Sequence, residues 1–268
     1  MRDKIGFHNK EFKNVLDEYN YNLNTGDIVA GTIFNKEANG FMVDIGTGIA
    51  GYLPEEEIIL EQNESIRNVK FHLINQTREF FILAKNQKSQ QLLLSVKRLD
   101  YIRGWKRIKQ LEEEDIIVEA DVYKVNKGGI LIKLEGLIGF IPQSHLIRAN
   151  INMAYKSIKC QLLLANEKKN QLVLSHKRAL LSIKSQKLKI GQIVYGEIAE
   201  IKDYGIFIAI DKMHALLHIS EIGDKHIKNI YNAFHIGQKI KVKIIHMDMK
   251  QGRISVSTRQ MINRHQQL

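Results

Sequence analysis

The chain has 268 residues, of which 44% are hydrophobic, and its net charge of +11 at pH 7 favours a polyanionic partner such as nucleic acid. No apolar run approaches the length of a membrane span, and the N-terminal residues lack the apolar core of a signal peptide, so we expect no membrane association. Cys160 is the single cysteine, which excludes a disulfide framework and a cysteine-rich metal cluster.

The first predicted element is a short helix within residues 1–21. Asn9 suits the cap of a helix because its side chain can accept a hydrogen bond from the first turn. Apolar residues follow it at helical spacing: Phe12, Val15, Leu16 and Tyr19.

Residues 22–97 are the first of three similar units. Short apolar segments, bounded by polar turns, predict five strands in this unit. They are expected at 28–33, 41–45, 51–54, 69–74 and around 93–96. Gly40 stands before the second strand, where glycine suits a bulge or a sharp bend.

Residues 98–113 are predicted to be a helical linker. Apolar residues there recur at three-residue steps: Leu99, Ile102, Trp105, Ile108 and Leu111. We interpret Trp105 as a packing residue between domains rather than as a platform on which a base stacks.

The second unit, residues 114–178, and the third, residues 188–262, repeat the order of strands found in the first. Residues 179–187 form a short basic linker to which no structure is assigned, and residues 263–268 form a tail. The strands are expected at 117–122, 130–134, 139–142, 157–163 and 173–176, and at 193–198, 206–210, 215–218, 239–245 and 253–257.

Three features secure the alignment of the units. Gly129 and Gly205 take the place of Gly40, and both prolines of the chain, Pro54 and Pro142, occupy one position of the first two units. A nearly identical sequence segment closes each unit, at 93–98, 173–178 and 255–259. Repetition of this kind indicates one small structural unit used three times.

Five short strands in about 75 residues predict a small antiparallel Greek-key barrel of the OB type. The expected fold class is therefore all-β, with three tandem five-stranded OB-fold barrels, an N-terminal helix and a helical linker. Basic character rises along the chain. The net charge is −2 over residues 22–97 (7 basic, 9 acidic), +4 over 114–178 (10 basic, 6 acidic) and +6 over 186–268 (13 basic, 7 acidic).

Four segments of the third unit resemble the RNA-binding module named for ribosomal protein S1: residues 194–198, 203–208, 217–220 and 252–257. The first two units instead read glycine, aromatic, aliphatic, proline at 51–54 and 139–142, as do the early modules of the ribosomal protein S1 family. The three-module arrangement with an N-terminal helix is similar to the short form found in cyanobacteria and plastids. The resemblance covers roughly residues 10–262.

This resemblance implies an RNA-binding surface on the third module, made by Tyr204, Phe207, His218, Asp248 and Arg253. Aromatic rings on OB-folds stack single-stranded bases, and basic side chains follow the phosphates. In this assignment Tyr204 and Phe207 stack bases, His218 stacks or hydrogen-bonds, Arg253 pairs with phosphate or stacks on a base, and Asp248 orients Arg253 or accepts from a base.

Two alternatives stay open at this point. Tyr204 and Phe207 are either the stacking site or ordinary barrel core, and the combination with Gly205, His218 and Arg253 favours the site. A second group of candidates consists of three lysines that alternate along one strand, Lys239, Lys241 and Lys243. These lysines are either part of the RNA surface or a solvated strand face.

The first two modules depart from this pattern. The positions that match Tyr204, Phe207, His218 and Arg253 are Asn39, Met42, Pro54 and Gln91 in the first module, and Gly128, Leu131, Pro142 and Gln171 in the second. No stacking platform is expected in either. We therefore expect the first module, with the N-terminal helix, to dock on the small ribosomal subunit, and the second to contribute charge through Lys124, Lys127, Lys168 and Lys169.

Other motifs are set aside. Residues 46–51 match the glycine pattern of dinucleotide sites, but no helix is predicted after them. His214 and His218 are four residues apart on a loop and strand, where this spacing does not gather metal ligands. Residues 55–57 are three glutamates on an expected surface segment.

The sequence therefore predicts a non-enzymatic RNA-binding protein of the small ribosomal subunit that captures single-stranded mRNA for translation initiation. Its expected partners are mRNA and the rRNA and proteins of that subunit, with no cofactor and no small-molecule substrate. The expected location is the plastid stroma, with the bacterial cytoplasm as the alternative. A free RNA chaperone, or the RNA-binding part of a ribonuclease, are the rival functions.

Overall fold

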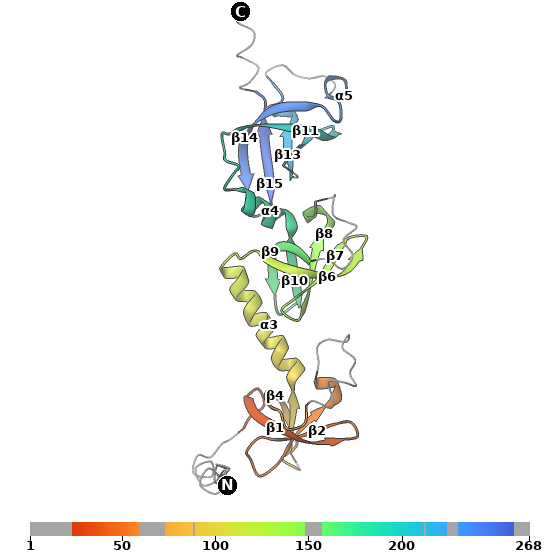
Figure 1. Ribbon diagram of the computed structural model, residues 1–268, viewed down its shortest axis with the longest axis vertical. Helices are drawn as coiled ribbons and strands as arrows, with labels where there is room; N and C mark the ends of the chain where they lie inside the picture. The colour runs from red at the N-terminus through yellow and green to blue at the C-terminus, as the bar shows by residue number, and fades with distance from the viewer. Residues whose placement is uncertain are drawn as a thin grey trace, which may run out of the picture. The chain divides into compact units, whose positions relative to one another are not determined.

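The computed structural model describes residues 23–58, 73–87, 89–147, 157–211, 213–223 and 230–259 (Figure 1). The predicted N-terminal helix and the C-terminal tail lie outside these residues. The chain forms two compact units, Met1–Lys106 and Arg107–Leu268.

The first unit contains a closed barrel of five strands. These are β1 (Ile28–Glu37), β2 (Gly40–Asp44), β3 (Gly51–Pro54), β4 (Thr77–Lys85) and β5 (Leu92–Ser95), which close in the order β1-β2-β3-β5-β4. Alternate residues point inward, so Ile33, Phe41 and Phe80 are fully buried. A single turn of 3₁₀ helix, η1 (Glu55–Glu57), follows β3.

The fourth strand of this barrel lies later in the chain than predicted. We expected it at 69–74, of which 73 and 74 are described and precede the strand. β4 is Thr77–Lys85, where it pairs with β1 from Ile28 opposite Phe81 to Thr32 opposite Thr77. Residues 69–73 alternate apolar and polar side chains, whereas Thr77–Lys85 contains an unbroken apolar run, 80–84. The alternation therefore favoured the wrong segment, and pairing with β1 identifies the strand.

The helix predicted in the first linker is α3, Val96–Glu113. Trp105 is only 2% exposed, and its ring meets that of Tyr101 edge-on, with the ring centroids 6.3 Å apart. Burial leaves no ring face open to a base, so Trp105 is not a stacking platform.

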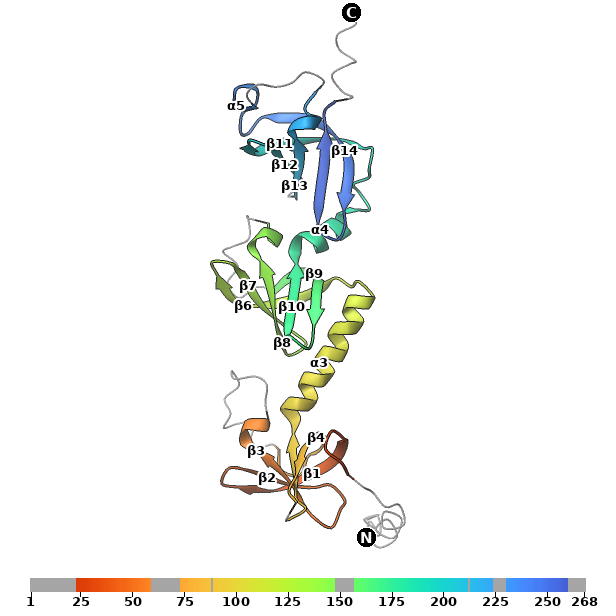
Figure 2. The same ribbon diagram turned by 180° about the vertical axis from the view of Figure 1, so that it is seen from behind.

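The second unit contains two more closed barrels, which both views show as separate bodies of strands (Figures 1 and 2). The second barrel is built from β6 (Val118–Asn126), β7 (Gly129–Leu134), β8 (Leu137–Pro142), β9 (Ser157–Asn166) and β10 (Gln171–Ser175). The third is built from β11 (Ile193–Lys202), β12 (Gly205–Ile210), β13 (Met213–His218), β14 (Lys239–Asp248) and β15 (Arg253–Ser257). The predicted class, all-β with three five-stranded barrels, is confirmed.

Short helices occur at the same places in these barrels. A 3₁₀ turn again follows the third strand, as η2 (Gln143–His145) and η4 (Ile219–Glu221). The linker to which no structure was assigned begins inside a helix, α4 (His176–Lys184), which Ser175 caps by accepting a hydrogen bond from the Arg178 amide. A further helix, α5 (Ile230–Ala233), was not predicted.

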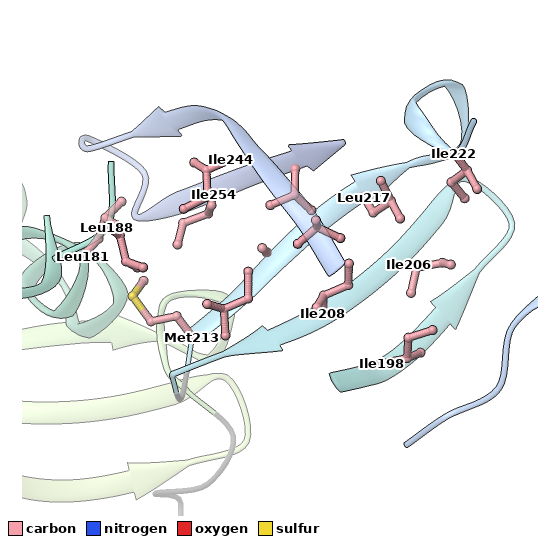
Figure 3. Close-up of a cluster of buried hydrophobic side chains, with 14 of the residues drawn as sticks. Leu181, Leu188, Ile198, Ile206, Ile208, Met213, Leu217, Ile222, Ile244 and Ile254 are labelled. Carbon is pink, nitrogen blue, oxygen red and sulfur yellow. The ribbon is translucent and has the colours of Figure 1, made fainter. Parts of the chain in front are cut away.

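Helix α4 contributes to the core of the third barrel. Leu181, together with Leu188 beyond the helix, packs with the apolar side chains that fill this barrel, beside Met213 (Figure 3). The turn between β14 and β15 lies against the same helix: at Gly252 a Cβ atom would stand 2.6 Å from the Arg178 nitrogen, and its φ is +64°. Only glycine suits this close approach and this left-handed conformation.

Candidate nucleic-acid interface

The register of the third barrel brings the outer side chains of three strands onto one surface. On β12 and β13, Gly205 pairs with His218, Phe207 with Leu216 and Ala209 with His214. β13 pairs with β15, where Leu216 is opposite Ser255. We name this outer surface of β12, β13 and β15, with Tyr204 before β12 and the end of β14, the β13 face.

Tyr204 and Phe207 lie together on the β13 face. Their rings meet edge to face, with centroids 6.2 Å apart and planes at 90°. Tyr204 is 51% exposed, whereas Ile206 and Ile208 fill the barrel interior and are fully buried. The alternative that the two rings are barrel core therefore fails, since they belong to the outer set of side chains.

Gly205 lets the two strands approach closely beneath these rings. A Cβ atom at this position would stand 2.4 Å from the Leu217 carbonyl oxygen and 3.0 Å from the His218 Cα. Both neighbours are backbone atoms and cannot move aside. The glycine between the two aromatic residues is thus required by the packing of β12 on β13.

His218 ends β13 and is exposed on the same face. Its side chain caps η4, because Nδ1 accepts a hydrogen bond from the Ser220 amide at 3.3 Å. The same Nδ1 atom lies 2.8 Å from the Ser220 hydroxyl. Because Nδ1 accepts, the neutral ring carries its proton on Nε2. His218 therefore offers an Nε2–H donor to an acceptor such as a phosphate or a base.

Asp248 and Arg253 form the last pair of β14 and β15, next to the turn that joins these strands. The Asp248 Oδ1 atom accepts a hydrogen bond from the Gln251 amide, at 3.0 Å, so its side chain holds the turn between the strands. Arg253 is exposed. The pKa of His145, in η2, is lowered by burial first, then by the charges of Lys177 and Arg253.

A bulge in β14 decides which of its side chains join this face. Ile244 is opposite Val256 but His246 is opposite Ser255, so Ile245 is an extra residue. Beyond the bulge the alternation is reversed, and His246 and Asp248 lie with Ser255 and Arg253 on the outer side.

The lysines of β14 lie elsewhere. They precede the bulge and pair with β11: Lys239 with Glu197, Lys241 with Tyr195 and Lys243 with Ile193. The structure therefore brings Tyr204, Phe207 and His218 together, with Arg253 and Asp248 at the other end of the same face. It does not bring Lys239, Lys241 and Lys243 to them.

Three exposed residues of this region were missed by sequence reasoning. His214 and Arg253 each precede the Ala215–Ile254 pair, so they are level on the β13 face. His246 reaches the face only through the bulge. Tyr231, on α5, donates from its hydroxyl to Asp203 Oδ1 at 2.9 Å, beside Tyr204 in the chain, and this hydrogen bond raises the pKa of Tyr231. The sequence pattern drew attention to His214 only as a metal ligand, and no sequence motif includes His246 or Tyr231.

The corresponding faces of the other barrels keep an aromatic ring, but on the third strand. Tyr52 is opposite Met42, and Phe140 is opposite Leu131. Each ring lies over the neighbouring glycine: a Cβ at Gly40 would stand 2.7 Å from Tyr52 Cζ, and one at Gly129 would stand 2.9 Å from the Phe140 ring. These rings are packed down on backbone, so they do not contradict the expectation that neither module has a stacking platform, which stays a prediction.

The motifs that were set aside show no other chemistry in the described part of the chain. Residues 46–50 are a loop that leads into β3 without a helix. Among the described residues, no cluster of histidine, cysteine, aspartate and glutamate could hold a metal ion. Within the same residues no helix is long and apolar enough to cross a membrane. Cys160 is buried, which raises the pKa of its thiol to about 12.

Comparison with known protein families gives this architecture a class. The family described as S1 RNA binding domain matches three stretches, residues 22–97, 112–184 and 187–259. The chain is therefore a tandem array of three S1 RNA-binding domains.

Comparison with whole proteins identifies the family more closely. The chain is 48% identical over 262 residues to the small ribosomal subunit protein bS1c of Pyropia yezoensis, covering 97% of this chain and 99% of that protein. It is 42% identical over 259 residues to the small ribosomal subunit protein bS1 of a Synechococcus species, covering 96% of this chain and 84% of that protein. The bS1c of Spinacia oleracea is 32% identical over 259 residues, which cover 96% of this chain and 62% of that protein. The chain belongs to the bS1 family of small ribosomal subunit proteins.

Proposed function

We propose that this protein is an RNA-binding component of the small ribosomal subunit that captures single-stranded mRNA for translation initiation. The observation that carries the proposal is the β13 face of the third barrel. There two outward rings, Tyr204 and Phe207, stand within reach of the His218 donor and share a surface with Arg253. Such a surface stacks bases and pairs phosphates without requiring a particular sequence.

The three modules have different roles in this proposal. The third binds mRNA, since it has the outward-facing aromatic pair, of which Tyr204 is exposed and Phe207 half-buried, and the highest net charge. The first, which has a net charge of −2 over residues 22–97, has the wrong sign for phosphate and docks on the subunit together with the N-terminal segment. The second adds charge beside the RNA path.

The proposed location is the plastid stroma. Two relatives, from Pyropia yezoensis and Porphyra purpurea, are named bS1c and are 48% and 47% identical to this chain over 262 residues. Because the relatives carry the names of ribosomal proteins, the protein is proposed to act by binding alone, without catalysis.

Sedimentation tests the ribosomal part of the proposal. An organelle lysate is separated on a sucrose gradient at low salt, and the protein is followed by immunoblotting. We expect it with the small subunit, and release from it as the salt is raised, because phosphate contacts weaken with salt. A chain found only at the top of the gradient at low salt would indicate a free RNA chaperone instead.

A further inference from the structure

The third barrel has a second exposed surface that combines an aromatic ring with basic side chains. It lies where β14, before its bulge, pairs with β11. Tyr195 stands opposite Lys241, with Lys239 and Lys243 two residues to either side on the same strand. Residues two apart on a strand point to the same face. We name Tyr195, Lys239, Lys241 and Lys243 the β11–β14 face.

The geometry of this face suits a nucleic acid. Tyr195 is 71% exposed, more than any other large aromatic side chain among the described residues. The Lys241 Nζ lies over its ring, 5.8 Å from the centroid, within the range of a cation–π contact. An exposed ring bordered by a row of ammonium groups can stack a base and hold the adjoining phosphates. Glu197, opposite Lys239, is the carboxylate that faces this row.

This face is separate from the β13 face. The third barrel closes in the order β11-β12-β13-β15-β14, so β12 and β15 separate β13 from β11 and β14 on the two sides. Phe207 lies on β12, next to β11, but it is opposite Glu200, whereas Tyr195 lies five residues earlier on β11. At about 3.3 Å per residue the two positions are about 15 Å apart, so one base cannot touch both rings.

The other two barrels lack this combination. At the places of Tyr195 and Lys241, the second barrel pairs Glu119 with Lys159, and the first pairs Ala30 with Glu79. Glu119 accepts a hydrogen bond from the Ser157 hydroxyl, and Glu79 forms an ion pair with Arg103. Both carboxylates repel phosphate, so at this position the combination of ring and lysines belongs to the third barrel. The exposed Tyr123 of the second barrel, with the Lys133 ammonium over its ring, lies elsewhere, on β6 beside β7.

We propose that the β11–β14 face is a second binding surface for single-stranded RNA, which stacks a base on Tyr195 and holds phosphates with Lys239, Lys241 and Lys243. It rests on the proposed RNA-binding function and extends it. An RNA longer than the β13 face can accommodate continues around the barrel to the second surface, and a short RNA does not.

Binding measured with two lengths of RNA tests this inference. The 268-residue chain is titrated by fluorescence anisotropy with an oligouridylate of about 6 nucleotides and one of about 30, since one OB-fold site covers about 4–16 nucleotides. The variant is Tyr195→Ala with Lys239→Gln and Lys241→Gln. We expect the Kd for the long RNA to rise about 5- to 100-fold, which is the cost of losing one stacked base and its phosphate contacts. The Kd for the short RNA should change by less than about twofold, because independent sites act additively.

Controls separate the second surface from the first. Lys159→Gln removes the matching lysine of the second barrel and should leave both affinities unchanged. The double variant Lys239→Gln with Lys241→Gln keeps the ring, and should lower the salt dependence for the long RNA by about 0.7 per lost phosphate contact. Circular dichroism should show native folding, since the changed side chains are exposed.

Three outcomes would overturn the inference. An unchanged Kd for the long RNA would show that the surface does not bind it. An equal loss for both lengths would show that Tyr195 belongs to the primary site. A wild-type chain that binds neither RNA would overturn the proposed function as well, whereas in the first two outcomes that function stands.

Discussion

The second and third barrels have the same strand order and register, but the outward side chains in one row across their strands differ in chemical type. Across the third barrel, one outer row reads Glu200, Phe207, Leu216, Ser255 and His246. Across the second, the matching row reads Lys124, Leu131, Phe140, Val173 and Leu164. The inward positions beside them are apolar in both, as at Ile132 and Ile208, which are fully buried.

This difference shows how the two sets of strand residues are used. The inward side chains make the barrel and are interchangeable among apolar types, since what matters is volume and burial. The outward side chains do not affect closure of the barrel, so they can differ between copies. Function in this protein is thus expected to change by substitution on the outer rows alone.

Among the substitutions that test this difference between the barrels, removal of the aromatic pair should have the largest effect on RNA affinity. Tyr204→Ala with Phe207→Ala should weaken binding to single-stranded RNA by at least about tenfold, because each ring stacks a base at about 1–3 kcal/mol. Anisotropy titration of the full chain measures it. Leu131→Ala, at the position of Phe207 in the second barrel, and Met42→Ala in the first are the matched controls and should change RNA affinity little. Equal losses from all three variants would show that the modules are not specialised.

Removal of the Arg253 charge, at the end of the β13 face, should have a smaller effect on RNA binding. Arg253→Gln gives the third barrel the residue that the second has at Gln171, and should reduce the slope of log affinity against log salt by about 0.7. Titrations at several salt concentrations provide the slope. Gln171→Ala should leave it unchanged. A slope that does not respond to Arg253→Gln would place this side chain away from phosphate.

Acid should destabilise the second barrel more than the third. Burial is the main cause that lowers the pKa of His176, whose Nδ1 donates to the Lys159 carbonyl oxygen at 2.7 Å. The unfolded chain, with the ordinary histidine pKa of 6.5, binds the extra proton first, so the stabilisation is complete above that pH and is lost as the pH falls towards the lowered pKa. His145, whose pKa is also lowered, acts in the same direction.

Substitution of His176 tests whether this side chain causes the acid sensitivity of the second barrel. His176→Val gives the second barrel the residue that the first has at Val96, and should reduce the fall in Tm between about pH 7.5 and about pH 5.5. Thermal unfolding followed by circular dichroism measures it. Thr258, at this place in the third barrel, does not titrate in that range. An undiminished pH dependence in the variant would contradict the assignment to His176.

The smallest effect concerns chemical reactivity. Cys160 occupies the inward position that Val242 has in the third barrel, and burial raises its pKa to about 12. Since the thiolate is the reactive form, iodoacetamide should label the native chain far more slowly than the urea-unfolded chain at the same pH. Mass spectrometry of the labelled peptide gives both rates. Equal rates would show that the second barrel opens readily.

The sequence by itself determined the barrels. The two-residue period of apolar side chains, the repeated glycine before the second strand and the closing sequence segment depend only on local order along the chain, so they predicted three five-stranded units and their alignment. The rising charge and the motif of the third unit likewise point to the third module as the RNA-binding one, which stays a prediction. The position of β4 was missed because residues 69–73 show the two-residue alternation, whereas the strand itself contains an unbroken apolar run, 80–84.

Only the tertiary structure decided which outer side chains share a face. Lys239 and His246 belong to one strand, yet the extra residue Ile245 reverses the alternation between them, and their partners are β11 and β15 respectively. A period of two assigns residues to alternating sides of a strand, but one inserted residue reverses the sides of all residues after it. Which side chains then lie next to each other depends on the strand with which each segment pairs. For this reason the predicted RNA site of the third barrel is resolved into two surfaces.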